Sequence, residues 1–237
     1  MRSVLNIVVA IFAFVSATAQ PINRKALVER HTVVNKKMDT LSSLSVGNGK
    51  FAFTVDATGL QSFPDAYAKG VPLGTESEWG WHSFPNTKGY KEEEALKTYH
   101  LNGRDVQYMV QWNSPEQNKN ACNYFRQNLH RLQLANIGLE ITKKDGTIFK
   151  IEDVKDIDQQ LNMWTGEIHS KFTVDGAPVE VITYCHQQDD MIGVKINSGL
   201  IKERRINIRI RLPYPTGGWA DMNTNFADEE KTSVCIK

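Results

Sequence analysis

The stretch INIRIRL, residues 206–212, decides the fold class. Isoleucine or leucine stands at every second position, and asparagine or arginine fills the positions between. Side chains alternate between the two sides of a β-strand, so this pattern predicts a strand with one apolar and one polar face. Asn207, Arg209 and Arg211 form the polar face, and because such groups are costly to bury we expect that face to lie in solvent.

Three further runs show the same alternation and predict strands. Their expected apolar faces comprise Phe51, Phe53 and Val55; Val106, Tyr108, Val110 and Trp112; and Ile192, Val194 and Ile196.

Tight turns are expected between these runs. Asn-Gly or Asp-Gly pairs stand at 102–103, 145–146 and 175–176, and both residues of such a pair tolerate the positive φ of a type I′ hairpin turn. The apolar phase slips by one residue near Ala135 and Asn136, which indicates a β-bulge or a strand break. With no repeat and no low-complexity linker, the sequence predicts one large antiparallel β-sandwich, an all-β fold.

One short helix is predicted after the run that contains Val106, Tyr108, Val110 and Trp112. Ser114 would cap it, Pro115 would occupy its first position, Gln117 its third, and it would end by about Asn128. Residues 20–45 are mixed and polar, and we expect an extended lead-in there, with the sandwich over residues 46–237.

Length and composition allow a real core and argue against nucleic-acid partners. The chain has 237 residues, of which 41% are hydrophobic. Its formal net charge is +1 and no Lys/Arg run exceeds two residues, so no broad positive field would attract a polyanion.

Residues 1–19 have the three parts of a secretory signal peptide. Arg2 precedes an apolar run at 4–15, and the small residues Ala17, Thr18 and Ala19 follow. The apolar run is too short for a stable membrane anchor. We expect cleavage after Ala19, a secreted or periplasmic protein, and no membrane association after cleavage. An N-terminal core strand is the alternative.

The sequence contains no motif typical of a metal site, a cofactor site or a catalytic nucleophile. Cys122, Cys185 and Cys235 are widely spaced, permit at most one disulfide, and lack C-x-x-C spacing. The six histidines form no i, i+2 or i, i+4 pair, and G-x-S-x-G, P-loop and H-E-x-x-H motifs are absent from the sequence. We therefore expect no metal site, no cofactor and no catalytic residue. Acidic runs at 92–94, 189–190 and 228–230 are expected to be solvated faces or turns.

The stretch GTESEWGWHSFPN, residues 74–86, holds the candidate binding residues Glu76, Glu78, Trp79, Trp81 and His82. On an extended backbone the two tryptophans would point to the same side. They could form a core wedge, or a flat platform for the C–H face of a sugar ring, with the other three supplying polar contacts. Aromatic neighbours could also desolvate the glutamates and raise their pKa.

Four stretches together carry a family resemblance. They are SLSVGNGKFAFTVDATGLQSFP at 43–64, GVPLGTESEWGWHSFPN at 70–86, DQQLNMWTGEIHSKFTVDGAPVEVITYCHQQDDMIGVKI at 158–196 and RIRLPYPTGGWADM at 209–222. Across most of residues 42–222 the chain resembles the N-terminal region of secreted bacterial members of the six-hairpin glycosidase superfamily, which includes maltose phosphorylase-like enzymes.

The resemblance implies an N-terminal β-supersandwich that packs against a helical (α/α)6 barrel carrying the catalytic glutamate. The sequence has no run of amphipathic helices after the sandwich region, so no residue matches that glutamate. We expect the sandwich portion of a carbohydrate-processing hydrolase or phosphorylase, inactive by itself, with an oligo- or polysaccharide and a helical catalytic domain as partners. The alternatives are a free-standing carbohydrate-binding module and a protein-interaction sandwich.

Overall fold

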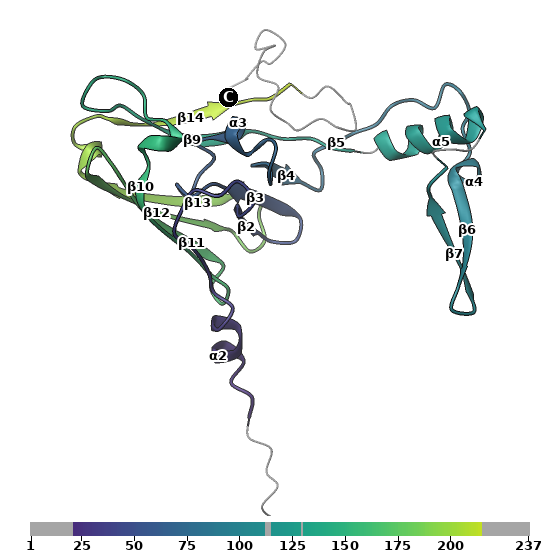
Figure 1. The fold of residues 1–237 in the computed structure, drawn as a ribbon, viewed down its shortest axis with the longest axis horizontal. Helices are drawn as coiled ribbons and strands as arrows, with labels where there is room; N and C mark the ends of the chain where they lie inside the picture. Colours follow the sequence, from purple (N-terminus) through teal and green to yellow (C-terminus); the bar gives the residue numbers. More distant parts are fainter. Residues whose placement is uncertain (1–20, 112–114, 129, 215–237) are drawn as a thin grey trace, which may run out of the picture.

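The protein is mostly β, with antiparallel sheets (Figure 1). The computed structural model describes residues 21–111, 115–128 and 130–214. Its strand pairs are antiparallel throughout this part of the chain. The predicted all-β, sandwich-like class is therefore confirmed.

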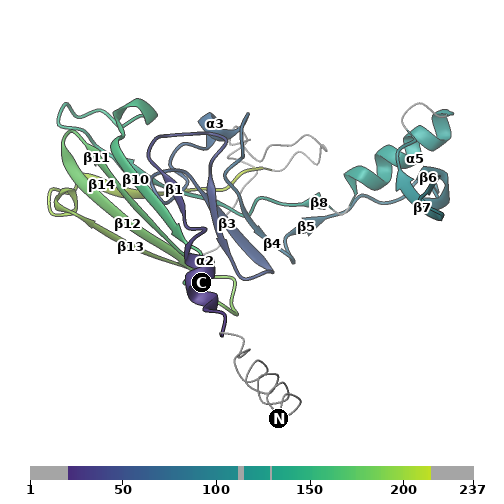
Figure 2. The same ribbon diagram turned by 60° about the horizontal axis from the view of Figure 1, so that its bottom comes forward.

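Two layers form the sandwich. The first layer is a sheet in the order β1 (Val33–Asn35), β10 (Lys155–Asn162), β11 (Glu167–Val174), β12 (Ala177–Cys185) and β13 (Ile192–Ser198). The second layer contains β2 (Leu44–Gly47), β3 (Phe51–Val55) and β4 (Thr75–Ser77), together with the pair β9 (Asn136–Ile141) and β14 (Ile206–Arg211). Strand β2 packs on β11 and β12, which brings the layers face to face (Figure 2).

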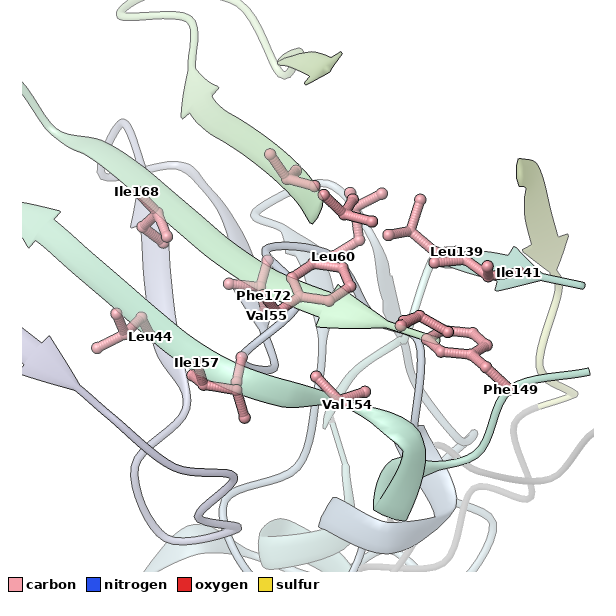
Figure 3. Packing of buried hydrophobic residues seen from close by; sticks show 14 of the residues in the cluster. Leu44, Val55, Leu60, Leu139, Ile141, Phe149, Val154, Ile157, Ile168 and Phe172 are labelled. Atoms are coloured by element: carbon pink, nitrogen blue, oxygen red, sulfur yellow. The ribbon is translucent and has the colours of Figure 1, made fainter. Parts of the chain in front are cut away.

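The core lies between these layers and follows the alternation of the strands. Phe51, Phe53 and Val55 of β3 are buried as predicted, and they belong to one cluster with residues of β9, β11 and β12. Figure 3 shows Phe172 from the first layer beside Val55 from the second, and Ile168 and Leu139 belong to the same buried cluster. Burial of these apolar side chains is the main term that stabilises the fold.

Two of the three predicted hairpin turns have the expected geometry. Asn102 and Gly103 have φ of 50° and 76°, and Asp175 and Gly176 have φ of 52° and 75°. Gly146 also has positive φ, but Asp145 does not, so the type I′ prediction is wrong at 145–146. There the Asp145 carboxylate accepts hydrogen bonds from the backbone and hydroxyl of Thr147 and closes a different turn.

The phase slip near residue 135 is a strand break. The short strand β8 (His130–Arg131) ends before it, and β9 begins at Asn136. The alternative of a bulge within one continuous strand is thereby excluded.

Strand β14 corrects the prediction for the opening stretch. Ile208 and Ile210 are 50% and 64% exposed, while Arg209 is half-buried and donates to the backbone oxygen of Ser62 at 2.9 Å. Arg209 pairs with Gly138, whose missing side chain lets the backbone of Gln61 approach closely. Backbone carbonyl groups of that segment accept hydrogen bonds from the guanidinium, so Arg209 is covered, whereas Asn207 on the same face is exposed as predicted and Ile208 and Ile210 of the apolar face lie largely in solvent.

A buried aspartate holds the loop after β3. The Asp56 carboxylate accepts hydrogen bonds from the backbone N–H groups of Thr58 and Phe63, at 2.8 and 2.9 Å, and from the Thr58 hydroxyl at 2.5 Å. Burial outweighs these bonds and raises the pKa of Asp56 to about 6.

The strand predicted from Val106, Tyr108, Val110 and Trp112 lies outside the sandwich. This corrects the expectation that residues 46–237 all belong to the sandwich. Strand β7 (Arg104–Met109) pairs with β6 (Leu96–Leu101), and Tyr108 is 48% exposed. Together with helices α4 (Glu92–Ala95) and α5 (Glu116–Gln127), this hairpin forms an arm, residues 83–128, that projects from the sandwich (Figures 1 and 2). The ribbon of β5 (Trp81–His82) and β8 connects the arm to the sandwich. Trp112 lies outside the described residues.

Helix α5 ends where predicted but begins later. Asn128 is its C-cap, and Pro115 is the N-cap without a side-chain hydrogen bond, so proline precedes the first turn. Ser114 lies outside the described residues. The fold also contains α2 (Arg24–Glu29), α3 (Pro64–Tyr67) and the 3-10 turns Ile151–Asp153 and Gly199–Ile201, so more than one short helix accompanies the strands.

The expected extended lead-in at 20–45 is only partly extended. It contains α2, which Asn23 caps through its side chain, and β1, which pairs with β10 and so joins the first sheet. None of the helices in the described part of the chain is both long enough and apolar enough to cross a membrane.

Candidate functional site

The candidate loop turns sharply where an extended backbone was expected. After β4 ends at Ser77, the N–H of Gly80 donates to the Ser77 oxygen, and the N–H of Trp81 donates to the Trp79 oxygen, both at 3.1 Å. Trp79 therefore lies in the turn and Trp81 in β5. The two indoles therefore do not project from one extended segment, and Gly80 between them leaves room for the Leu134 side chain, which a Cβ atom there would meet at 2.7 Å.

Both indoles are solvent-accessible. Trp79 is 63% and Trp81 51% exposed. Because both indoles are exposed, they do not form a wedge in the core. The alternative that remains is a surface on which a sugar ring could stack.

Trp79 is exposed and yet anchored. Its Nε1 donates to Oδ2 of Asp190 at 2.7 Å, and the Ser77 hydroxyl donates to the same oxygen at 2.5 Å. The hydrogen bond from Ser77 and a smaller one from Trp79 lower the pKa of Asp190, so the carboxylate is ionised at neutral pH. Asp190 stands in the turn between β12 and β13, so these bonds connect the two layers.

Asn48 adds a second connection to the same turn. Its side-chain nitrogen donates to the backbone oxygen of Asp189 at 3.1 Å, while its Oδ1 accepts from the N–H groups of Lys50 and Phe51. The acidic run at 189–190 was expected to be a solvated face or turn, and both aspartates are exposed between β12 and β13. Sequence reasoning missed Asp190 as a site residue because its partner Trp79 is 111 positions away along the chain.

The two candidate glutamates lie on a shallow groove beside Trp79. Glu76 is half-buried on β4, and Glu78 forms an ion pair with Lys50 at 3.3 Å, with both side chains largely exposed. The tryptophans therefore do not desolvate Glu78. Arg131 lines the groove, whose volume is about 450 Å³, and donates to the backbone oxygens of Ser77 and Glu78.

Glu76 and Glu78 are two positions apart in one segment of the chain, with Ser77 between them. Glycoside hydrolysis requires two carboxyl groups that face each other across the sugar. The groove instead offers the two carboxylates together with Lys50 and Arg131, and Trp79 follows Glu78 directly in the chain. His82 lies in β5, where its backbone pairs with His130.

Metal ligands and thiols are the remaining groups to place. Within the described residues, no group of three or more His, Cys, Asp or Glu side chains is placed to hold a metal ion. Cys122 is buried in the arm and Cys185 is half-buried in β12, both as free thiols, and burial raises the pKa of Cys185. Cys235 lies outside the described residues.

Comparisons with known proteins do not assign a class. No family model matches the sequence, and no curated protein matches it significantly. The resemblance to six-hairpin glycosidases therefore stays a prediction.

Proposed function

We propose that this chain is the β-sandwich portion of a secreted carbohydrate-processing protein of the six-hairpin glycosidase type, and that the loop around Trp79 contacts a saccharide. The anchored but exposed indole carries the proposal. A large apolar ring held in solvent gains by stacking on a ligand, and its fixed orientation lowers the entropy cost of binding.

Each residue of the loop has a role in this proposal. Trp79 stacks on the C–H face of a sugar ring, and Asp190 holds the indole in place. Glu76 and Glu78 accept hydrogen bonds from sugar hydroxyls, and Trp81 and His82 extend the contact surface along β5. In the six-hairpin glycosidases a helical (α/α)6 domain carries the catalytic acid, so in this proposal the sandwich binds the sugar and does not supply that acid.

Binding is tested with the protein cleaved after Ala19 and a panel of neutral oligosaccharides, measured by calorimetry. We expect Trp79→Ala to weaken binding about tenfold or more, and Asp190→Ala, which releases the indole and the Ser77 hydroxyl but keeps the ring, to have a smaller effect. Tyr108→Ala, which removes another exposed aromatic ring, this one from the arm, is the matched control. Absence of glycan binding, or equal losses in the control, would refute the proposal.

A hydrolysis assay tests the expected inactivity. We expect no product from the purified chain with aryl glycosides or oligosaccharides. Turnover that disappears in Glu76→Gln or Glu78→Gln would overturn this expectation and place the chemistry in the groove.

A second candidate function is protein interaction through the arm. Leu101 and Tyr108 of its hairpin are 45% and 48% exposed, and Tyr99 packs edge-on against Tyr108 with ring centroids 5.8 Å apart. Exposed apolar side chains on a projecting hairpin favour contact with a partner chain. Concentration-dependent self-association in sedimentation, lost in Leu101→Ser, would support this candidate, whereas a monomer at all concentrations would count against self-association.

A further inference from the structure

Tyr184 lies across the outer face of the first sheet, over a glycine of the neighbouring strand. It pairs with Gly193, and a Cβ atom at Gly193 would come within 2.3–2.6 Å of the tyrosine ring and hydroxyl. Only glycine leaves room for this arrangement. One side of the ring rests on the backbone of β13, and the residue is still 45% exposed.

A pocket with preorganised polar groups adjoins this ring. Its volume is about 340 Å³, and Tyr184 lines it together with Thr165, Glu167, Cys185, His186, Gln187 and Gln188.

The pocket's carboxylate is held in place by its neighbours. Glu167 accepts a hydrogen bond from the Thr165 hydroxyl at 3.2 Å, and Nε2 of His169 lies 3.4 Å from the same oxygen. A carboxylate fixed in this way can accept a hydrogen bond from a ligand hydroxyl at little entropic cost.

His186 lines the same pocket and is held by its own turn. Its Nδ1 lies 3.0 Å from the backbone nitrogen of Asp189 and 3.2 Å from the Asp189 carboxylate. These contacts fix the position of the imidazole ring at the pocket's edge.

The lining residues define the ligand chemistry. They include no lysine or arginine, so the pocket has nothing to neutralise a phosphate, sulfate or uronic acid. An aromatic face, a fixed carboxylate and side-chain amides instead suit a ring with apolar C–H groups on its face and hydroxyl groups at its rim.

We propose that Tyr184 and this pocket form a second saccharide site, specific for a neutral sugar ring. The proposal rests on the proposed carbohydrate function and extends it to a chain of several sugars. Asp190, which anchors Trp79, and Gln188, which lines the pocket, belong to the same β12–β13 turn. The competing explanation is that Tyr184 only shields Gly193 on the edge strand β13.

The experiment is a ¹⁵N NMR titration of the wild-type protein with malto-, cello- and xylo-hexaose. We expect the Gly193 amide to shift on binding, and Tyr184→Ala to weaken binding about tenfold. Gly193→Ala keeps the tyrosine but displaces its ring, so it should weaken binding as well. Amide spectra and melting temperatures of each variant report folding.

The outcomes separate the two sites. If Trp79→Ala abolishes binding while Tyr184→Ala binds like wild type and Gly193 does not shift, the Trp79 site stands and the second site is refuted. If Tyr184→Ala and Gly193→Ala lose affinity and Trp79→Ala does not, the second site stands and the Trp79 site falls. Absence of binding by the wild type overturns both. If Tyr184→Ala does not fold, the Gly193 amide in the wild type decides whether the second site exists. A shift on binding supports the site, and no shift refutes it.

Discussion

The sandwich and the arm are stabilised in different ways. The sandwich buries one continuous apolar cluster drawn from both layers, with Phe53, Val55 and Leu139 fully buried. The arm's buried hydrophobic cluster comprises only Ala95, Ala121 and Cys122. A two-stranded hairpin and a twelve-residue helix are marginal by themselves.

The difference shows that secondary structure alone does not indicate stability. Strands β6 and β7 are longer than β2 and β4, but their side chains are mostly exposed. We therefore expect the arm to open locally at a low free energy while the sandwich unfolds as a unit. Four predictions test this contrast.

The largest effect is expected in the core. Phe53→Ala leaves a cavity between the layers and should lower the free energy of unfolding by about 3–5 kcal/mol. Phe125→Ala in the arm should change the same transition by less than about 1 kcal/mol, because the arm shares few contacts with the sandwich. Urea denaturation followed by circular dichroism measures both. Equal losses would mean that the two regions unfold together.

The second effect is a pH dependence confined to the sandwich. Burial raises the pKa of Asp56 from 3.8 to about 6, so between these values the folded state binds more protons than the unfolded state. Its stability should therefore fall as pH rises through this window, by at most about 3 kcal/mol.

The matched variant Asp56→Asn cannot ionise. Its stability profile between pH 4 and 7 should be flatter than that of the wild type in denaturant titrations. Identical slopes for the two proteins would show that Asp56 does not titrate in this range.

A matched pair of glycines gives the third prediction. Gly103 in the arm and Gly176 in the sandwich have nearly equal φ, and nothing would contact a Cβ at either. Alanine should cost about 1–2 kcal/mol at each turn. Gly176→Ala should lower global stability, whereas Gly103→Ala should only speed hydrogen exchange in β6 and β7. A global loss from both would contradict local opening of the arm.

The smallest effect is the opposite pH trend in the arm. The backbone N–H of Lys91 donates to Glu94 at 2.9 Å, and this bond, followed by one from Gln117, lowers the pKa of Glu94. Its stabilising effect on α4 is present above the unfolded pKa and is lost as pH falls through the folded pKa. The Lys91 amide resonance should follow this titration in the wild type and not in Glu94→Gln.

The alternation of apolar and polar residues and the turn residues correctly predicted the features that depend on neighbours in the sequence. The burial of β3, the hairpin turns at 102–103 and 175–176, and the end of α5 follow from neighbours in the sequence. A type I′ turn needs only two residues that accept positive φ, so the sequence shows it directly.

Tertiary packing decided the features that the sequence did not predict. The alternation in β7 and β14 identifies two faces but not what covers each one, so it could not show that Tyr108 lies on a projecting hairpin or that carbonyl groups cover Arg209. The candidate loop was found by its tryptophans. Asp190 was missed because its hydrogen bonds join distant segments.

The arm is inserted between β5 and β8, two short strands that pair with each other. Trp81 pairs with Arg131 and His82 with His130, so the chain leaves the sandwich and returns at adjacent positions. A tight reverse turn could join these two ends without altering the order of the sandwich strands. Gain, loss or exchange of the segment between them therefore requires no change in the topology of the rest, and a grafted peptide at this point would be presented away from the sheets.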